Sequence, residues 1–318
     1  MRFAFKTTPQ NSTWADMLAV WREADDIDVY ESGWTFDHFY PIFTDSTGTC
    51  LEGWSTLTAL AQATTRLRLG AMVTGIHYRH PAVLANMAAA LDIISNGRLE
   101  LGIGAGSNVE ESDACGIKLG TVKERLDRLE EAVQVLISLL SQEHTTFDGT
   151  YYQLKDAHNE PKGPQRPHPP ICIGGFGEKR TLPLVARYAQ HWNYAAGIPE
   201  DFGRRRDVLA ARCADIGRDF SEITTSAHLF LGDPMLTRTP NPDVALTDGD
   251  YDEFITDAIA FGEKGLDLAI VYLPLPLDPA VVVKLAEAIT RANLTGKDSE
   301  PEHASSLRAS CSRHEDPT

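Results

Sequence analysis

The sequence has no long apolar run and comparatively few basic residues. No stretch approaches the roughly 20 apolar residues that a membrane-spanning helix needs, and the first ten residues, MRFAFKTTPQ, lack the apolar segment of a signal peptide. Lysine and arginine number 29 against 45 aspartates and glutamates, which gives a formal net charge of -16. Such an acidic surface repels nucleic acid and anionic membranes. We therefore expect neither as a partner.

Cysteine is scarce, and no pairing or metal motif is present. The cysteines are odd in number, widely spaced and form no CxxC pair: Cys50, Cys115, Cys172, Cys213 and Cys311. This pattern favours a reduced, cytoplasmic protein. His77 and His80 lie three residues apart, but no third ligand stands near them, so we expect no metal. The sequence has no G-x-S-x-G elbow, no P-loop and no H-E-x-x-H.

Apolar strand-like runs alternate with helical patterns along most of the chain. The strand-like runs span residues 2–5, 29–36, 67–76, 98–106, 171–177, 192–196, 223–232 and 266–274. Each is followed by a segment in which the apolar residues have helical spacing. Eight such βα units predict an α/β protein with a closed (β/α)8 TIM barrel, as a single domain over residues 1–293. A doubly wound open sheet is the alternative fold.

The fourth helix, predicted to begin after Thr121, shows the clearest pattern. Thr121 and Glu124 form a capping box at its start. The apolar residues that share one face are Val122, Leu126, Leu129, Val133, Leu136 and Leu140. We expect this face to pack against the sheet.

Two segments interrupt or end the alternation. Residues 142–169 are rich in proline, glycine and histidine, and we interpret them as a lid-like insertion between the fourth helix and the fifth strand. We expect this insertion and the loops after the last two strands to shape the substrate site. Residues 294–318 are polar, lack an apolar period and are predicted to form a disordered tail.

Polar residues follow several of the predicted strands. Asp37 and His38 follow the second strand. Thr74 lies near the end of the third, and Ser107 and Asn108 follow the fourth. In a closed barrel these tips meet at one mouth, where the catalytic groups of such barrels lie. An acid beside a histidine is more often a solvated or capped pair than a catalytic one, but the convergence of the tips favours a site.

One glycine cluster ends the fourth strand. Its alternating members are Gly102, Gly104 and Gly106. Either a tight barrel corner excludes side chains there, or bare backbone lets a flat ring or a phosphate approach. The acids that follow, Glu110, Glu111 and Asp113, are interpreted as a solvated loop, although Glu110 is near enough to the glycines to be a candidate cofactor contact.

A second glycine cluster, Gly174, Gly175 and Gly177, precedes a helix expected to begin near Lys179. Free N–H groups and the positive end of a helix form an anion seat, to which Arg180 adds a cation. A glycine-rich turn without any ligand is an alternative of equal weight.

Four longer stretches contain or flank these tips. They are FDHF, LRLGAMVTGIHYRHPAVLANMAAALDIISNGRLELGIGAG, ERLDRLEEAVQVL and PPICIGGFGEKRTLPLVARYAQHWN. In them the chain resembles the bacterial luciferase-like monooxygenase superfamily, and more closely its coenzyme F420-dependent oxidoreductases. The resemblance covers about residues 1–293 and is most specific over 66–140. It implies a deazaflavin in the barrel mouth, a small-molecule substrate and a homodimer.

The resemblance also implies roles for individual residues. His38 would lie against the deazaflavin and act as a general acid, since histidine has an unperturbed pKa of ~6.5. Asp37 would hydrogen-bond the ring or orient His38. Met72, Val73 and Thr74 would bulge behind the ring, commonly with a non-proline cis peptide.

The two glycine-rich tips would hold the rest of the coenzyme. Gly106, Ser107 and Asn108 would line the ring or its side chain, and Ser107 is a further candidate catalytic residue that could hydrogen-bond the substrate. The residues expected to hold the coenzyme phosphate are Gly174, Gly175, Phe176 and Gly177, with Arg180 beside them.

Some positions depart from the family pattern. Ser107 stands where the sugar-phosphate dehydrogenase relatives have a glutamate that acts in proton transfer, and Ile42 stands where they have tryptophan. A sugar phosphate is therefore not the expected substrate. Val29 replaces a glycine before the second strand. Two other functions stay open: a monooxygenase that uses reduced FMN and oxygen, and a flavin-binding relative without catalysis.

Overall fold

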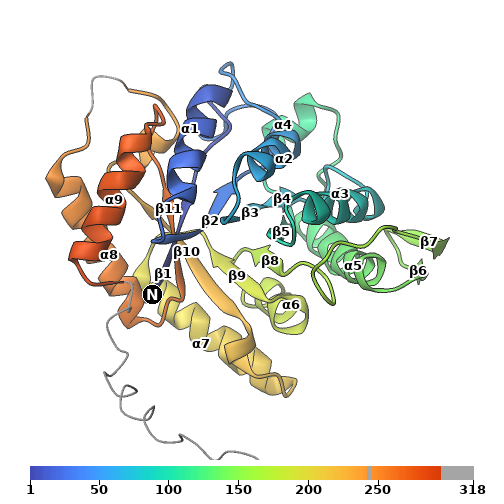
Figure 1. Cartoon of the computed structure of the whole chain (residues 1–318). Helices are drawn as coiled ribbons and strands as arrows, with labels where there is room; N and C mark the ends of the chain where they lie inside the picture. The colour runs from blue at the N-terminus through green and yellow to red at the C-terminus, as the bar shows by residue number, and fades with distance from the viewer. Residues whose placement is uncertain (242–244, 295–318) are drawn as a thin grey trace, which may run out of the picture.

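Parallel strands close into a barrel, and helices surround it (Figure 1). The structure, a computed structural model, describes residues 1–241 and 245–294. The barrel strands are β1 (Arg2–Lys6), β2 (Tyr30–Thr35), β3 (Arg68–Ala71), β4 (Thr74–Gly75), β5 (Leu99–Gly104), β8 (Ile171–Gly174), β9 (His191–Tyr194), β10 (Thr224–Phe230) and β11 (Leu268–Tyr272).

The strand order proves closure. Neighbours run β3-β2-β1-β11-β10-β9-β8-β5-β4, and a further parallel pairing of β3 with β5 joins the two ends. The short strands β3 and β4 occupy one position of the barrel, each pairing with a different part of β5. The predicted (β/α)8 barrel is therefore confirmed, and the open-sheet alternative is wrong.

The helices cover the outside of the barrel. They are α1 (Trp14–Asp25), α2 (Gly53–Ala63), α3 (Pro81–Ile94), α4 (Val109–Ala114), α5 (Val122–Ser141), α6 (Thr181–Tyr188), α7 (Pro199–Asp215), α8 (Asp248–Glu263) and α9 (Pro279–Arg291), with 3-10 turns η1 (Phe220–Glu222) and η2 (Pro234–Thr237). Local sequence explains several starts: Pro81 stands in the first turn of α3, and the His80 side chain accepts the N–H of Ala82.

Helix α5 shows both the reach and the limit of apolar periodicity. Thr121 and Glu124 form the predicted capping box. Leu129, Val133 and the following stripe residues are buried against the barrel, but Val122 is 63% exposed. The inclusion of Val122 in the packed face is wrong, because the first turn of the helix extends beyond the apolar surface.

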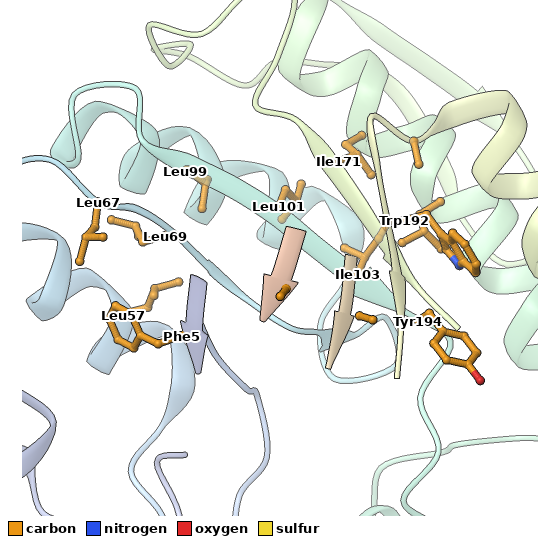
Figure 2. Close-up of a cluster of buried hydrophobic side chains, with 14 of the residues drawn as sticks. Phe5, Leu57, Leu67, Leu69, Leu99, Leu101, Ile103, Ile171, Trp192 and Tyr194 are labelled. Atoms are coloured by element: carbon orange, nitrogen blue, oxygen red, sulfur yellow. The ribbon is translucent and has the colours of Figure 1, made fainter. Parts of the chain in front are cut away.

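Alternation along the strands divides the core into two shells. Outward side chains such as Phe5, Leu101 and Trp192 pack under the helices (Figure 2). The smaller cluster inside the barrel consists of Ala4, Trp34, Met72, Cys172, Leu268 and Ile270. This apolar plug lies between a larger cavity at the carboxyl ends of the strands and a smaller one of about 290 Å³ at their amino ends.

A buried polar network lies inside the barrel near the amino ends of its strands. Glu100 Oε2 is 2.9 Å from Nδ1 of His191, and Arg68 Nε donates to Glu100 Oε1 at 2.8 Å. His191 Nε2 is 2.7 Å from Oγ of Ser226. Burial alone would raise the pKa of Glu100, but His191 and Arg68 outweigh it and lower that pKa to about 2.

The insertion at 142–169 forms an antiparallel hairpin, β6 (Thr145–Asp148) and β7 (Gln153–Ala157), followed by an irregular return. Its turn is fixed to α5, since the Glu131 carboxylate accepts the backbone N–H groups of residues 150–152. The hairpin lies outside the helix ring beside α5 (Figure 1), and none of its residues lines the cavity described below. The expected lid-like role is therefore wrong.

Three further predictions concern thiols, membranes and the tail. Among the described residues the free cysteines are Cys50, Cys115, Cys172 and Cys213. No helix within residues 1–241 and 245–294 has the length and apolar character needed to cross a membrane. Apart from Leu294, the predicted tail at 294–318 lies outside the described residues, as does Cys311.

Candidate functional site

A cavity of about 550 Å³ lies at the carboxyl ends of the barrel strands. Its wall combines residues from distant parts of the chain, including Lys6, His38, Gly104, Gly174 and Tyr272. This volume is typical of a small-molecule site, and the carboxyl end is where such barrels bind ligands. Residues from several of the predicted strand tips line the cavity, among them His38, Ser107 and Gly174.

His38 is held by a carboxylate that comes from α4. Glu111 Oε2 is 2.8 Å from Nδ1 of His38. The other Glu111 oxygen accepts the N–H of Phe39, and the Tyr78 hydroxyl donates to the same carboxylate. Asn108 fixes the start of α4, because its side chain accepts the Glu111 N–H at 3.2 Å. Glu111 is thus a positioning residue for His38.

The electrostatics of this group favour an ionised Glu111. The side chain is fully buried, and burial alone would raise its pKa. Hydrogen bonds from His38, the Phe39 N–H and Tyr78 outweigh burial and lower the pKa of Glu111. Nδ1 of His38 therefore donates to the carboxylate, while Nε2 has no hydrogen-bond partner within the described chain. The second nitrogen is left for a ligand in the cavity.

Asp37 points into a different environment from that expected. Its carboxylate is 1% exposed and forms a two-point ion pair with Arg79, whose Nη2 also donates to Glu52 at 2.9 Å. Burial, only partly offset by Arg79, raises the pKa of Asp37. Asp37 does not line the cavity and does not contact His38 through a hydrogen bond. The orienting contact implied for Asp37 is made by Glu111 instead.

The third tip has the expected irregular backbone. The Met72–Val73 peptide is cis, and both residues line the cavity. Thr74 does not line it: the hydroxyl is buried and accepts the indole N–H of Trp54 at 2.9 Å. Thr74 therefore supports the bulge from behind, which corrects its assignment as a cofactor contact.

The bulge explains why glycine is required around it. A Cβ on Gly104 would lie 2.6 Å from Cγ2 of Val73, and one on Gly174 would lie 3.0 Å from Cγ1 of Val73. A Cβ on Gly102 would lie 2.0 Å from the Ala71 carbonyl oxygen, so a side chain is excluded there as well. Tight packing against Val73 is thus one reason for these glycines. Because Gly104 and Gly174 also line the cavity, their bare backbone forms part of a flat wall.

Only some of the residues that follow β5 line the cavity. Gly106 adopts φ +85°, which favours glycine, and lines the wall together with Ser107. Asn108 serves as the helix cap and does not line it. Glu110 is exposed and accepts the Ser46 hydroxyl at 3.2 Å. Glu110 therefore does not reach the cavity, whereas its neighbour Glu111, interpreted from sequence as solvated, is buried beside His38.

The glycine turn at 174–177 forms part of the cavity wall, but the nearby Arg180 forms ion pairs away from the cavity. Gly174, Gly175 and Phe176 line the cavity, and Gly177 does not. Arg180 Nη2 donates to Asp127 at 2.7 Å and lies 3.5 Å from Glu130. Helix α6 begins at Thr181, a cavity residue, and not near 179. Arg180 is thus paired with acids on α5 and is not available as a free phosphate ligand.

Sequence reasoning missed several residues of the site. They are Lys6, Tyr78, Glu111, His228 and Arg238. Two signals were available: Lys6 ends a strand in the inward-facing register, and His228 stands in the same inward-facing register as the polar Ser226. Glu111 had no such signal, because its orientation depends on the turn that caps α4.

Potential metal ligands gather elsewhere. Within the described residues one group of three lies close together, His144, Asp156 and His158 on the exposed hairpin. Among the described residues that form the cavity wall there is no cysteine and no carboxylate, so the donor set at the mouth does not suit a metal.

The cavity does fit a flat, anionic cofactor. One wall is bare backbone at Gly104, Gly106, Gly174 and Gly175. Nε2 of His228 is buried without a hydrogen-bond partner in the described structure. A ring with polar edges would cover the backbone and could supply that partner. The fold and site together define a TIM barrel with a cavity of small-molecule size at its mouth, beside a histidine–carboxylate pair.

Comparison with known proteins identifies the family. The family model described as luciferase-like monooxygenase matches residues 1–233, and the chain belongs to this family. It is 31% identical over 218 residues to the F420-dependent hydroxymycolic acid dehydrogenase of Mycobacterium tuberculosis, which covers 68% of this chain and 58% of that protein. It is 30% identical over 192 residues to the F420-dependent glucose-6-phosphate dehydrogenase of Amycolatopsis mediterranei, which covers 59% and 54%.

The chain spans 58% and 54% of the lengths of those two curated relatives. Among solved structures, an F420-dependent secondary alcohol dehydrogenase in complex with an F420-acetone adduct superposes with a TM-score of 0.75. The alignment covers 92% of this chain and 98% of that one at 21% identity. This likeness establishes the fold alone.

Proposed function

We propose that this protein is an F420-dependent oxidoreductase that transfers a hydride between the deazaflavin and a small organic substrate, with reduction favoured. The substrate would carry a carbonyl, imine or activated alkene. Family membership, the F420-dependent relatives and the cavity at the barrel mouth support this proposal. The observation that carries it is the His38–Glu111 pair, which presents an imidazole nitrogen to the cavity.

The cofactor supplies two-electron hydride chemistry, and the protein must supply the rest. A carbonyl or imine that gains a hydride also needs a proton. His38 can provide it from Nε2, since Nδ1 is tied to Glu111 and an imidazolium carries a proton on each ring nitrogen. Ser107 is exposed in the wall and is a second candidate donor to the substrate.

The wall residues would position the cofactor. Met72 and Val73 form the bulge on which the ring would rest, and the bare backbone of Gly106 would face its edge. The turn at Gly174 to Phe176, together with the Thr181 hydroxyl, would hold the phosphate; the Gly175 N–H itself donates to the Asn193 carbonyl, which leaves the donors that follow it in the turn. Arg180 is left out of this set because of its pairing with Asp127.

A titration of the purified protein with F420 and with FMN tests the proposal. F420 fluorescence should change on binding, and reduced F420 should then be oxidised when enones, imines or ketones are added. Tight binding of FMN alone would favour the monooxygenase, and F420 binding without turnover of any candidate would favour the non-catalytic relative. The homodimer stays a prediction, which a mass measurement in solution would check.

A further inference from the structure

A second set of polar groups lies in the same cavity, apart from the His38–Glu111 pair. Lys6 reaches the wall from β1 and is 3% exposed. Its ammonium group donates to the Met72 carbonyl at 2.9 Å and lies 4.5 Å from the centre of the Tyr272 ring. An ammonium group has three N–H donors, so two have no protein oxygen among the described residues.

Lys6 also has no counter-ion. No carboxylate within residues 1–241 and 245–294 lies within ion-pair distance of its Nζ. Burial lowers the pKa of Lys6 to about 7. A buried ammonium without a partner is costly to desolvate. The cost falls if a bound ligand brings negative charge to it.

His228 reaches the wall from β10 and is equally unsatisfied. It is 7% exposed, and its buried Nε2 has no hydrogen-bond partner in the described part of the chain. Burial and the nearby Lys6 lower the pKa of His228, so the ring is neutral. The His228 side chain lines the cavity wall, and a neutral imidazole carries one N–H that it can donate to a bound ligand.

The sheet brings these two side chains together. Strand β11 lies between β1 and β10, with Lys6 in register with Tyr272 and His228 in register with Ile270. The ring of Tyr272 contacts both, since the His228 ring centre lies 5.4 Å from it. Lys6 and His228 thus flank one tyrosine on one side of the cavity.

The charged residues of the whole cavity wall also favour a negatively charged ligand. The protein carries a net charge of -16, yet no aspartate or glutamate among the described residues lines the cavity. Arg238 adds a permanently charged guanidinium to the wall, 5.0 Å from the centre of the Phe43 ring. A cavity of this kind repels cationic ligands and attracts anionic ones.

We infer that Lys6 and His228 form a binding subsite for a negatively charged oxygen of a bound ligand. The oxygen belongs either to an acidic group of the substrate, such as a carboxylate, or to the cofactor ring, whose oxygens gain negative charge when the ring accepts a hydride. The identity of the ligand rests on the proposed function; the subsite itself rests on the geometry of Lys6, His228 and Tyr272.

The first experiment needs no cofactor. Side-chain 15N NMR of lysine-labelled wild-type protein would follow the titration of Lys6, with Lys6→Met used to assign its signal. Acetate or inorganic phosphate should raise the pKa of Lys6, while the exposed Lys123 on α5 should not respond. A Lys6 titration that neither anion alters would overturn the subsite, even if the protein binds F420.

The second experiment identifies the source of the oxygen. Lys6→Met is compared with Lys123→Met, after equal thermal unfolding has shown that both fold. If the substrate supplies the oxygen, Lys6→Met should raise KM for oxo-acids by roughly 10- to 100-fold more than it raises KM for neutral ketones, the scale of a charged hydrogen bond. If the ring supplies it, binding of reduced F420 should weaken by a similar factor.

Unchanged values in both assays would contradict the inference. Failure of wild-type protein to bind F420 would instead contradict the proposed function.

Discussion

The Glu111 carboxylate lies 2.8 Å from Nδ1 of His38, across 73 positions of sequence. One residue comes from the six-residue helix α4, and the other follows β2. The contact fixes which nitrogen of the imidazole faces the cavity. The hydrogen bonds from His38, the Phe39 N–H and Tyr78 lower the pKa of this buried carboxylate.

Replacing Glu111 by glutamine should lower kcat more than it changes KM or F420 affinity. The amide keeps the shape of the side chain but removes the charged acceptor that holds Nδ1 of His38. We expect a loss of about 100-fold in hydride transfer, the lower end of the range for general acid–base catalysis. Glu110→Gln, on the exposed neighbour, is the matched control and should behave as wild type.

Replacing His38 by alanine should also cut hydride transfer by roughly 100-fold or more. Stopped-flow absorbance of reduced F420 measures the step directly. Fluorescence titration must show that the variant still binds the cofactor. Normal turnover in that variant would remove His38 from the mechanism. His80→Ala serves as a control, because His80 caps α3 and does not line the cavity.

Replacing Asp37 by asparagine should affect stability more than cofactor binding. Asp37 is buried in an ion pair with Arg79, which retains its contact with Glu52. We expect a loss of about 1–3 kcal/mol in the free energy of unfolding, as for a disrupted buried charged hydrogen bond. The dissociation constant for F420 should stay close to that of wild type. A large loss of F420 affinity at unchanged stability would return Asp37 to the cofactor site.

The sequence was sufficient for the barrel because its signals are local. Apolar periodicity, the Thr121–Glu124 capping box and glycines at strand ends each depend on a few neighbouring residues. The direction of a loop side chain depends on distant packing. Asp37 turns toward Arg79, Arg180 turns toward Asp127, and the insertion folds back on Glu131.

The same reasoning explains which site residues were found. Met72, Gly174 and Gly175 were found because their position at strand tips forces them to the mouth. Thr74 occupies such a tip as well, yet its side chain faces Trp54, because the bulge at Val73 reverses the alternation there. The position of a residue along its strand predicts whether it lies at the barrel mouth. The direction in which its side chain points depends on local irregularities of the backbone.

Replacing Gly104 by alanine should destabilise the barrel. A Cβ at that position would lie 2.6 Å from Cγ2 of Val73, so the bulge must move. Overpacking of this kind costs about 1–3 kcal/mol. Gly262→Ala is the control, because Gly262 belongs to α8 and a Cβ added there would meet no atom within 4 Å. That variant should gain roughly 0.5–1 kcal/mol from helix propensity, and urea denaturation would measure both.

Replacing Glu100 by glutamine should destabilise the protein in a pH-dependent way. The buried carboxylate lies against both His191 and Arg68, and its removal leaves two cations uncompensated. Breaking such a pair costs about 3–5 kcal/mol. The folded-state pKa of Glu100 is lowered from 4.5 to about 2. Its ionised form therefore stabilises the fold fully above about pH 4.5, and this contribution is lost as the pH falls toward 2.

The corresponding measurement is the difference in free energy of unfolding between wild type and Glu100→Gln, taken by urea denaturation from pH 7 downward. The difference should be constant at neutral pH and should shrink below about pH 4.5. Glu31→Gln, which removes the more exposed pair with Arg2, should cost no more than about 1 kcal/mol. Equal effects of the two variants at pH 7 would show that the Glu100 network does not stabilise the interior of the barrel.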